Sequence, residues 1–293
     1  MVIFPAATPV GSKDGDWVIQ VKTGEKPAMA SNDAVDLFIY GDAGRKGPLN
    51  LAKINAGKFK ANAIDQFIHR FPLSEVGKVY KIRIGRLEQV EDSWFIDWVK
   101  VNHNFTQLAL NFECKRWLSR KMDDQDVWRE MPAVYKDEKP LALLRYKLLV
   151  YTGRRLGSET DARISVELRG QRGDSGPRVL FKPLNGNPKT FRQNQMDEFE
   201  IEAVDLDDLT SLFVFHGNKE KGTGWFLERI TVRVDSLDKE WHFACKKWLD
   251  TGEEDGVIER ILYPGAPPPK GKTFVEQKFV EPVVNFSFGK FRT

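Results

Sequence analysis

A seven-residue segment occurs twice in the sequence, as FECKRWL at 112–118 and as FACKKWL at 243–249. Five of the seven letters are identical, and the only two cysteines of the chain, Cys114 and Cys245, occupy the same position in both copies. An internal repeat constrains the fold strongly, because each copy is expected to form the same structural unit. We therefore expect two similar domains.

The repeat extends upstream of this segment and covers most of the chain. WVIQVKTG (17–24) corresponds to YKLLVYTG (146–153), and SWFIDWVKV (93–101) corresponds to GWFLERITV (224–232). The matched blocks keep an offset of 128 to 132 residues. We expect five segments: an N-terminal tail (1–15), domain 1 (16–128), a linker (129–143), domain 2 (144–263), and a Pro-rich exit with an apolar C-terminal tail (264–293).

Hydrophobic residues alternate with polar residues in both copies. Ile164, Val166 and Leu168 alternate with Ser165 and Glu167, which is the period-two pattern of a half-buried strand. Turn-forming segments such as GDAGRKGP and LNGNPK separate these runs. The sequence therefore predicts an all-β chain of two tandem antiparallel β-sandwiches.

The repeated cysteine segment stands at the end of each copy. Phe112 and Cys114 lie on one face of a predicted strand, and Trp117 and Leu118 follow directly. In copy 2 the same residue types recur in the same order. We expect this segment to fold over the end of each sandwich and close its core.

The composition limits the class of protein. The chain has 41% hydrophobic and 30% charged residues, as soluble globular proteins do. Its 45 basic and 42 acidic residues give a net charge of +3, too little for a nucleic-acid-binding face. The first residues lack the features of a secretory signal, and no run has the length of a spanning helix. With only two cysteines, we expect reduced thiols and a cytoplasmic location.

Six blocks occur in the same order in both copies: a strand ending in TG, an ND or TD pair, a GxxGxxGP turn, a D-x-F strand, an S-W-F or G-W-F strand, and F-x-C-x-x-W-L. In this combination the chain resembles the PLAT domain, also called the lipoxygenase homology or LH2 domain, over about 17–128 and 144–263. The resemblance implies two packed four-stranded sheets per domain. It also implies peripheral work at membranes or protein partners, and tandem copies resemble segments of longer PLAT arrays.

The resemblance further implies a calcium site in the loops at one end of a sandwich. A calcium ion needs several oxygen ligands. In copy 2 the two loops are GRRLGSETD (153–161) and HGNKEKGTGW (216–225), and Gly217 replaces the aspartate that the family pattern has there. The residues that could provide oxygen ligands are Gly157, Ser158, Glu159, Asp161 and Asn218. Because carboxylates are few, we expect weak calcium binding.

In copy 1 the equivalent carboxylate is Asp33, and Arg86 stands in the facing loop, where it would repel a cation. The alternative is that Asp33 and Asp161 cap turns by accepting hydrogen bonds from backbone N–H groups.

Membrane contact is a second hypothesis. Peripheral domains insert exposed apolar tips and attract anionic lipid with basic residues. Two tips have this composition: Leu156 beside Arg154 and Arg155, and Phe59 between Lys58 and Lys60. The alternative is that both apolar side chains pack against their own domain.

Protein binding is a third hypothesis. Trp98 stands where copy 2 has Arg229, and by alternation it points away from Val99 and the core. An exposed tryptophan near Phe95 is a typical interface anchor. The other domain or the C-terminal tail could cover it instead.

The sequence contains no pattern that indicates catalysis, since it has no GxSxG, no phosphate loop and no metal-ligand spacing of its four histidines. We expect a non-catalytic adaptor, peripheral to a membrane or the cytoskeleton, with weak calcium dependence in domain 2. The alternative is a purely protein-binding scaffold with no lipid or metal role. The apolar tail TFVEQKFVEPVVNFSFGKFRT is expected to add a strand to a domain or to contact another protein.

Overall fold

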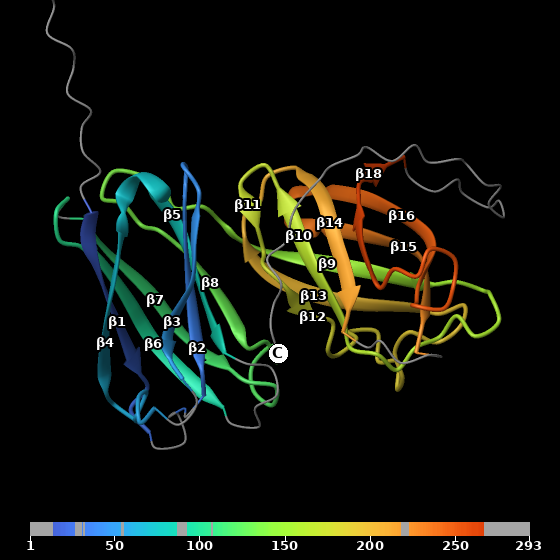
Figure 1. Cartoon of the computed structure of the whole chain (residues 1–293), viewed down its shortest axis with the longest axis horizontal. Helices are drawn as coiled ribbons and strands as arrows, with labels where there is room; N and C mark the ends of the chain where they lie inside the picture. The colour runs from blue at the N-terminus through green and yellow to red at the C-terminus, as the bar shows by residue number, and fades with distance from the viewer. Residues whose placement is uncertain are drawn as a thin grey trace, which may run out of the picture.

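The chain folds into β-strands in the part that the computed structural model describes, residues 14–26, 31, 33–53, 56–86, 93–106, 108–217 and 223–266. The strands form four antiparallel sheets, two in each half of the chain (Figure 1). Two short 3-10 helices, η2 (Leu73–Glu75) and η3 (Asp235–Leu237), are the helical elements of these residues. The all-β fold class predicted from the sequence is confirmed.

Domain 1 is a sandwich of two four-stranded sheets. Sheet A has the strand order β4-β1-β6-β7, and sheet B has the order β3-β2-β5-β8. The strands of sheet A are β1 (Asp14–Thr23), β4 (Ile64–Pro72), β6 (Trp94–His103) and β7 (Leu108–Leu118), and those of sheet B are β2 (Val35–Gly41), β3 (Arg45–Ala52), β5 (Val79–Arg86) and β8 (Trp128–Pro132). Strand β8 pairs with β5, so residues 129–132 belong to sheet B.

Domain 2 repeats this arrangement with additional short strands. Sheet C has the order β13-β9-β15-β16-β18, and sheet D has the order β11-β10-β14-β17, with β12 also paired to β10. The strands of sheet C are β9 (Leu143–Thr152), β13 (Met196–Val204), β15 (Trp225–Val234), β16 (Lys239–Leu249) and β18 (Pro264–Gly265), and those of sheet D are β10 (Ile164–Gly170), β11 (Gly173–Asp174), β12 (Arg178–Val179), β14 (Leu209–His216) and β17 (Glu259–Leu262). The two-residue strands bring each sheet of domain 2 to five strands.

Each domain has its own hydrophobic core between its two sheets. In domain 1 the buried Trp94 donates its indole N–H to Thr23 Oγ1 at 3.2 Å. In domain 2 Trp225 donates to Thr152 Oγ1 at 2.9 Å. Because an unpaired buried N–H costs stability, the TG and W-F blocks of the sequence together fix β1 against β6 and β9 against β15.

The repeated cysteine segment forms the end of β7 and of β16. Leu118 and Leu249 are fully buried. The tryptophans before them lie on the other face, where Trp117 packs edge-on against Phe95 at 5.2 Å between ring centroids. The segment therefore contributes to the core with one face and covers the outside of the sheet with the other.

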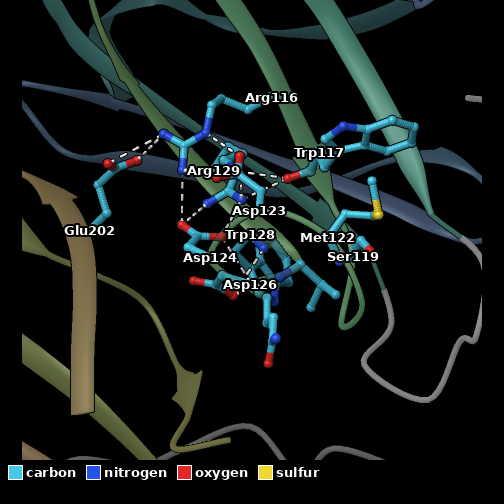
Figure 2. A network of polar contacts seen from close by, with 12 residues as sticks. Arg116, Trp117, Ser119, Met122, Asp123, Asp124, Asp126, Trp128, Arg129 and Glu202 are labelled. Carbon is cyan, nitrogen blue, oxygen red and sulfur yellow. Dashed lines mark hydrogen bonds and ion pairs between the residues drawn. The ribbon is translucent and has the colours of Figure 1, made fainter. Parts of the chain in front are cut away.

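An arginine after each cysteine segment holds the segment in place. Arg129 donates to the carbonyl oxygen of Trp117 from Nε at 3.0 Å and from Nη2 at 2.6 Å. It also forms an ion pair with Asp124, which Figure 2 shows beside Arg116. Arg116 extends this network to domain 2, since its Nη1 lies 3.0 Å from Glu202 Oε1. The cluster of Arg116, Asp124 and Arg129 thus holds the end of β7 in domain 1 and also contacts domain 2.

A buried ion pair of domain 1 contacts domain 2. Lys81 Nζ lies 2.8 Å from Glu130 Oε2, and both side chains are fully buried. The same Glu130 oxygen accepts the backbone N–H of Val204 in domain 2 at 2.8 Å, and Lys81 donates to the carbonyl oxygen of Asp174 at 2.6 Å. Arg178 of domain 2 lies with Nη2 3.6 Å from Glu130 Oε1. Burial lowers the pKa of Lys81, while Glu130 opposes the shift, so the buried charges depend on one another.

The turn between β11 and β12 of domain 2 packs against sheet B of domain 1. Tyr40 donates its hydroxyl to Asp174 Oδ1 at 2.8 Å, and Arg83 donates to the carbonyl oxygen of Pro177 at 2.8 Å. The Arg83 guanidinium also lies 3.7 Å from the centroid of the Trp128 ring, and burial lowers its pKa to about 10. The GDSGP turn, which the sequence indicates only as a turn, is an interdomain contact.

Sheet C of domain 2 runs in a different direction from the strands of domain 1, whereas β10 and β14 of sheet D run up and down the view as those strands do (Figure 1). In Figure 1 the strands of domain 1 run up and down the view, and β1 ends at the bottom. Strand β9 of domain 2 runs across the view, so that the loop after it lies at the right. The interdomain contacts hold the two loop ends in this arrangement.

Candidate functional site

The loop after β9 is a fixed turn. Ser158 donates its hydroxyl to the carbonyl oxygen of Gly153 at 2.8 Å and its N–H to that of Arg155 at 3.1 Å. The N–H of Phe226 in turn donates to the carbonyl oxygen of Ser158 at 3.1 Å. Gly157 has a φ of +74°, which glycine adopts without strain. The turn is therefore held by its own hydrogen bonds.

Leu156 lies at the tip of this turn and is 92% exposed. The two arginines beside it are held by neighbours. Arg154 donates from Nε to Asn194 Oδ1 at 2.7 Å. Arg155 lies 4.2 Å from the centroid of the Phe226 ring and 3.3 Å from Glu254. The turn presents one apolar side chain to solvent, and the two residues before it carry guanidinium groups held by neighbours.

The predicted calcium ligands of domain 2 do not converge in the described residues. Asp161 has a side chain that is 86% exposed and forms an ion pair with Arg192. Glu159 is partly buried, and the Ser158 carbonyl already accepts a hydrogen bond from Phe226. Asn218 lies outside the described residues. Among the residues described, no three His, Cys, Asp or Glu side chains form a group that could hold a metal ion.

In domain 1 the prediction that Asp33 is a calcium ligand is wrong. Its Oδ2 lies 2.5 Å from Arg86 Nη1, and the two side chains are 7% and 0% exposed. The N–H of Asp33 donates to Ser31 Oγ at 3.2 Å. Arg86, which was expected to repel a cation, is itself the positive partner of Asp33. Its buried charge requires a carboxylate partner.

The prediction that Phe59 is a membrane tip is also wrong, because the side chain is fully buried. Its ring lies 4.7 Å from that of Trp94 and 5.8 Å from that of Phe67. Its backbone has a φ of +54°, and its N–H donates to Asp65 Oδ2 at 2.8 Å. This left-handed turn directs the ring into the core.

The two lysines that flank Phe59 lie at the surface. Lys58 and Lys60 are exposed, and Lys58 Nζ lies 3.8 Å from Asp65 Oδ1. Without an exposed apolar side chain between them, these lysines do not form the predicted tip.

The protein-contact residues predicted in domain 1 lie on the outer face of sheet A. Trp98 is half-buried, with Lys100 Nζ 4.6 Å from its ring centroid. It pairs in register with Lys22 on β1 and Glu113 on β7. Phe95 is half-buried against Trp117 and lies further along the same strand.

Sequence reasoning missed two residues of this face. Ile64 and Ile68 on β4 are 55% and 60% exposed. In register, Ile64 lies across from Lys22, whose other neighbour is Trp98. A signal existed in the repeat, because copy 2 has Glu200 where copy 1 has Ile68. The exposed isoleucine makes this face more apolar than the equivalent face of domain 2.

Both cysteine thiols are protonated at neutral pH. Burial raises the pKa of Cys114 to about 11 and that of Cys245 to about 12. A thiol acts as a nucleophile only as the thiolate, so neither side chain is an activated nucleophile. Within the described residues, no helix has the length and apolar character needed to cross a bilayer.

Comparison with known proteins gives concordant matches. The PLAT/LH2 domain model matches residues 17–129 and 146–263. Lipoxygenase homology domain-containing protein 1 of Homo sapiens is 32% identical over 252 residues, which are 85% of this chain and 12% of that protein. Polycystin-1-like protein 3 of Homo sapiens is 29% identical over 147 residues, which are 50% of this chain and 8% of that protein. The chain thus spans a small part of the length of these relatives.

Among solved structures, coral 8R-lipoxygenase, described as activated by calcium through a C2-like domain, is 21% identical with a TM-score of 0.36. The match covers 41% of this chain and 17% of the lipoxygenase chain.

Proposed function

The chain belongs to the PLAT/LH2 domain family, and from this premise we propose that it is a non-catalytic tandem adaptor that docks on membrane surfaces through domain 2. The observation that carries the proposal is Leu156, which is 92% exposed at the tip of a hydrogen-bonded turn. The proposed location is cytoplasmic, peripheral to a membrane or the cytoskeleton. We further propose that the two domains can form part of a longer array.

A fixed turn favours insertion because little conformational entropy is lost on binding. Complete burial of a leucine side chain in the bilayer interface contributes about 2 kcal/mol. Each basic residue near an anionic surface adds about 1 kcal/mol, and here Arg154 and Arg155 flank the tip. The proposed docking is therefore weak and reversible, and it depends on anionic lipid.

The test is co-sedimentation with phosphatidylcholine vesicles that contain phosphatidylserine. We expect Leu156→Asp to reduce the bound fraction by about tenfold, because it places a charge at the inserting tip. The matched control is Leu237→Asp. Leu237 is 47% exposed and lies in η3 after β15, at the opposite end of domain 2 from the tip. Equal binding of both variants and of the unmodified chain would contradict docking through Leu156.

We place the calcium dependence of docking in domain 2, where Asp161 is exposed, and not in domain 1. A site with so few carboxylates is expected to have a Kd of about 10⁻⁴ to 10⁻³ M. Calorimetric titration of calcium into the chain should show heat that is lost in Asp161→Ala and kept in Asp235→Ala, a control at the other end of the domain. If the unmodified chain gives no heat, calcium has no part in the function.

A second candidate function is a protein-binding scaffold without a lipid or metal role. It is favoured by the outer face of sheet A, where the exposed Ile64 lies in the row of Lys22 and Trp98, and Ile68 is exposed further along β4. Ile68→Glu, which introduces the residue of domain 2, should abolish capture of a partner protein. Gln66→Glu, on the same strand and face, is the control. Two results together would favour the first function: Leu156→Asp removes vesicle binding, and Ile68→Glu leaves the capture of a partner protein intact.

A further inference from the structure

The two domains differ at one sheet edge. In domain 2, strand β16 is covered by β18, with His242 paired to Gly265 and Phe243 paired to Pro264. In domain 1 the equivalent strand β7 is the last strand of sheet A in the described part of the chain. An uncovered edge presents backbone N–H and C=O groups that can pair with an added strand.

The difference has a local cause in the sequence. After β8, Ala133 donates its N–H to the carbonyl oxygen of Tyr80 at 2.8 Å, so the chain continues along sheet B. Tyr135 then donates its hydroxyl to the carbonyl oxygen of Val79 at 2.8 Å. The equivalent position after β17 is Pro264, which has no N–H to donate. In domain 2 the chain therefore leaves sheet D and pairs with β16, whereas in domain 1 it stays on sheet B.

A groove of about 830 Å³ lies between the β7 edge and the segment after β8. Its apolar lining is Leu73, Val79, Leu108, Leu110, Val134 and Tyr135. Val134 is 56% exposed, which is unusual for a residue so near the core. The groove thus combines an uncovered strand edge with apolar side chains, the two components that strand addition requires.

We propose that an added β-strand occupies this groove along the β7 edge, and that the strand is the segment VVNFSF (283–288) of the same chain. This segment lies outside the described residues. From Val284 onward its sequence alternates, with Val284, Phe286 and Phe288 on one face and Asn285 and Ser287 on the other, and Val283 precedes this alternation on the face of Asn285. The apolar face matches the lining of the groove, and the polar face remains in water.

The length of the intervening chain permits this contact. The 16 residues 267–282 separate the described end of domain 2 from the segment, and they begin with a Pro-rich run. At about 3.1 Å per residue they span about 50 Å, more than the diameter of about 35 Å expected for one such domain. Domain 2 itself provides the precedent, since the residues that follow its β17 already cover the β16 edge.

Amide hydrogen exchange of residues 108–112 in the full chain tests the proposal. We expect protection of this edge in the unmodified chain and exchange faster by about tenfold in the double variant Phe286→Asp/Phe288→Asp. The matched control is Asn285→Asp/Ser287→Asp, which adds the same charges to the opposite face of the same segment and should keep the protection. These substitutions lie outside both domain cores, so the domains remain folded.

A variant on the groove side provides an independent arm. Val134→Asp should accelerate exchange at residues 108–112 as the phenylalanine pair does, while Leu156→Asp should leave it unchanged. Equal exchange in the unmodified chain and both tail variants would overturn the proposal. Protection that falls on hundredfold dilution would also overturn it, because the added strand would then come from a second copy.

Discussion

Domain 1 and domain 2 contain the same buried turn at equivalent positions. Phe59 and Phe191 both have a left-handed backbone, with φ of +54° and +55°. The N–H of each donates to an aspartate on the following strand, Asp65 at 2.8 Å and Asp197 at 2.7 Å. Both rings point into their cores, where they are fully or almost fully buried. A strained turn is retained in both copies because the core depends on the ring that it delivers.

The surfaces of the two domains differ instead. The outward residues of β4 include two exposed isoleucines, whereas β13 has Glu198, Glu200 and Glu202 at its outward positions. The loop aspartate is buried against Arg86 in domain 1, but its equivalent in domain 2 is exposed. The two copies are thus alike at these core positions and differ at these surface positions.

The largest effect is expected at the buried ion pair of domain 1 that contacts domain 2. Glu130→Ala leaves the Lys81 ammonium and the Val204 N–H buried without their partner, and should lower the free energy of unfolding by about 3–5 kcal/mol. At the equivalent sheet position domain 2 has Ile261, which is half-buried, and Ile261→Ala should cost about 1–2 kcal/mol. Urea unfolding followed by tryptophan fluorescence measures both.

Glu138→Ala is the control for the glutamate. Glu138 pairs with Lys78 at 2.6 Å, but both side chains are 53% exposed, so its loss should change stability by no more than about 0.5 kcal/mol. If Glu130→Ala costs no more than this control, the buried ion pair does not hold the domains together.

The next comparison concerns the closing arginines. Arg129 is 3% exposed and Arg260 is 12% exposed, and each donates to the carbonyl oxygen of a tryptophan. Arg129 forms ion pairs with Asp124 and Asp123, and Arg260 forms one with Asp255. Arg129→Ala should lower the free energy of unfolding by about 3 kcal/mol and Arg260→Ala by about 2 kcal/mol. The loss is larger at Arg129 because its partners are more buried, so water replaces the lost arginine less well. Hydrogen exchange of β7 and β16 assigns each loss to its domain. Destabilisation of β16 by Arg129→Ala would show that the closures are not independent.

A smaller effect should appear in acid. Burial raises the pKa of Asp124, but hydrogen bonds and charge from Arg129 outweigh it, so the pKa lies below its usual range. The stabilisation is present above the unfolded value of about 4 and is lost as the pH falls through the lower folded value. The side chain is 33% exposed, so the contribution is about 1 kcal/mol after screening. Asp124→Asn should remove this acid dependence from urea unfolding curves measured between pH 5 and pH 2.

The smallest difference concerns the two thiols. With pKa values of about 11 and about 12, the thiolate fraction at pH 8 is about 10⁻³ for Cys114 and about 10⁻⁴ for Cys245. Iodoacetamide should therefore modify both slowly, and Cys114 about tenfold faster. Mass spectrometry of the two peptides over time measures the ratio. A rapid reaction at either cysteine would mean that the closing segment opens in solution.

The sequence was sufficient for the two domains and their strand content, because alternation and repetition directly report which faces are buried. It was misleading at Phe59, because the composition of this loop, a phenylalanine between two lysines, does not reveal a left-handed turn that directs the ring into the core. It did not identify Asp33 and Arg86 as a pair, since they lie on loops and strand ends whose contact depends on packing. The sequence gives no sign that Lys81 and Glu130 are buried, because their burial depends on the contact with domain 2.

The position of the loop after β9 determines what a docked molecule can do. In Figure 1 this loop lies at the end of domain 2 that is turned away from domain 1, so a flat surface that met it would have domain 2 between itself and domain 1. Because Glu130 and Lys81 contact domain 2, the two domains are joined by more than the linker. A ligand held by domain 1 would accordingly stand away from the surface, separated from it by the length of domain 2.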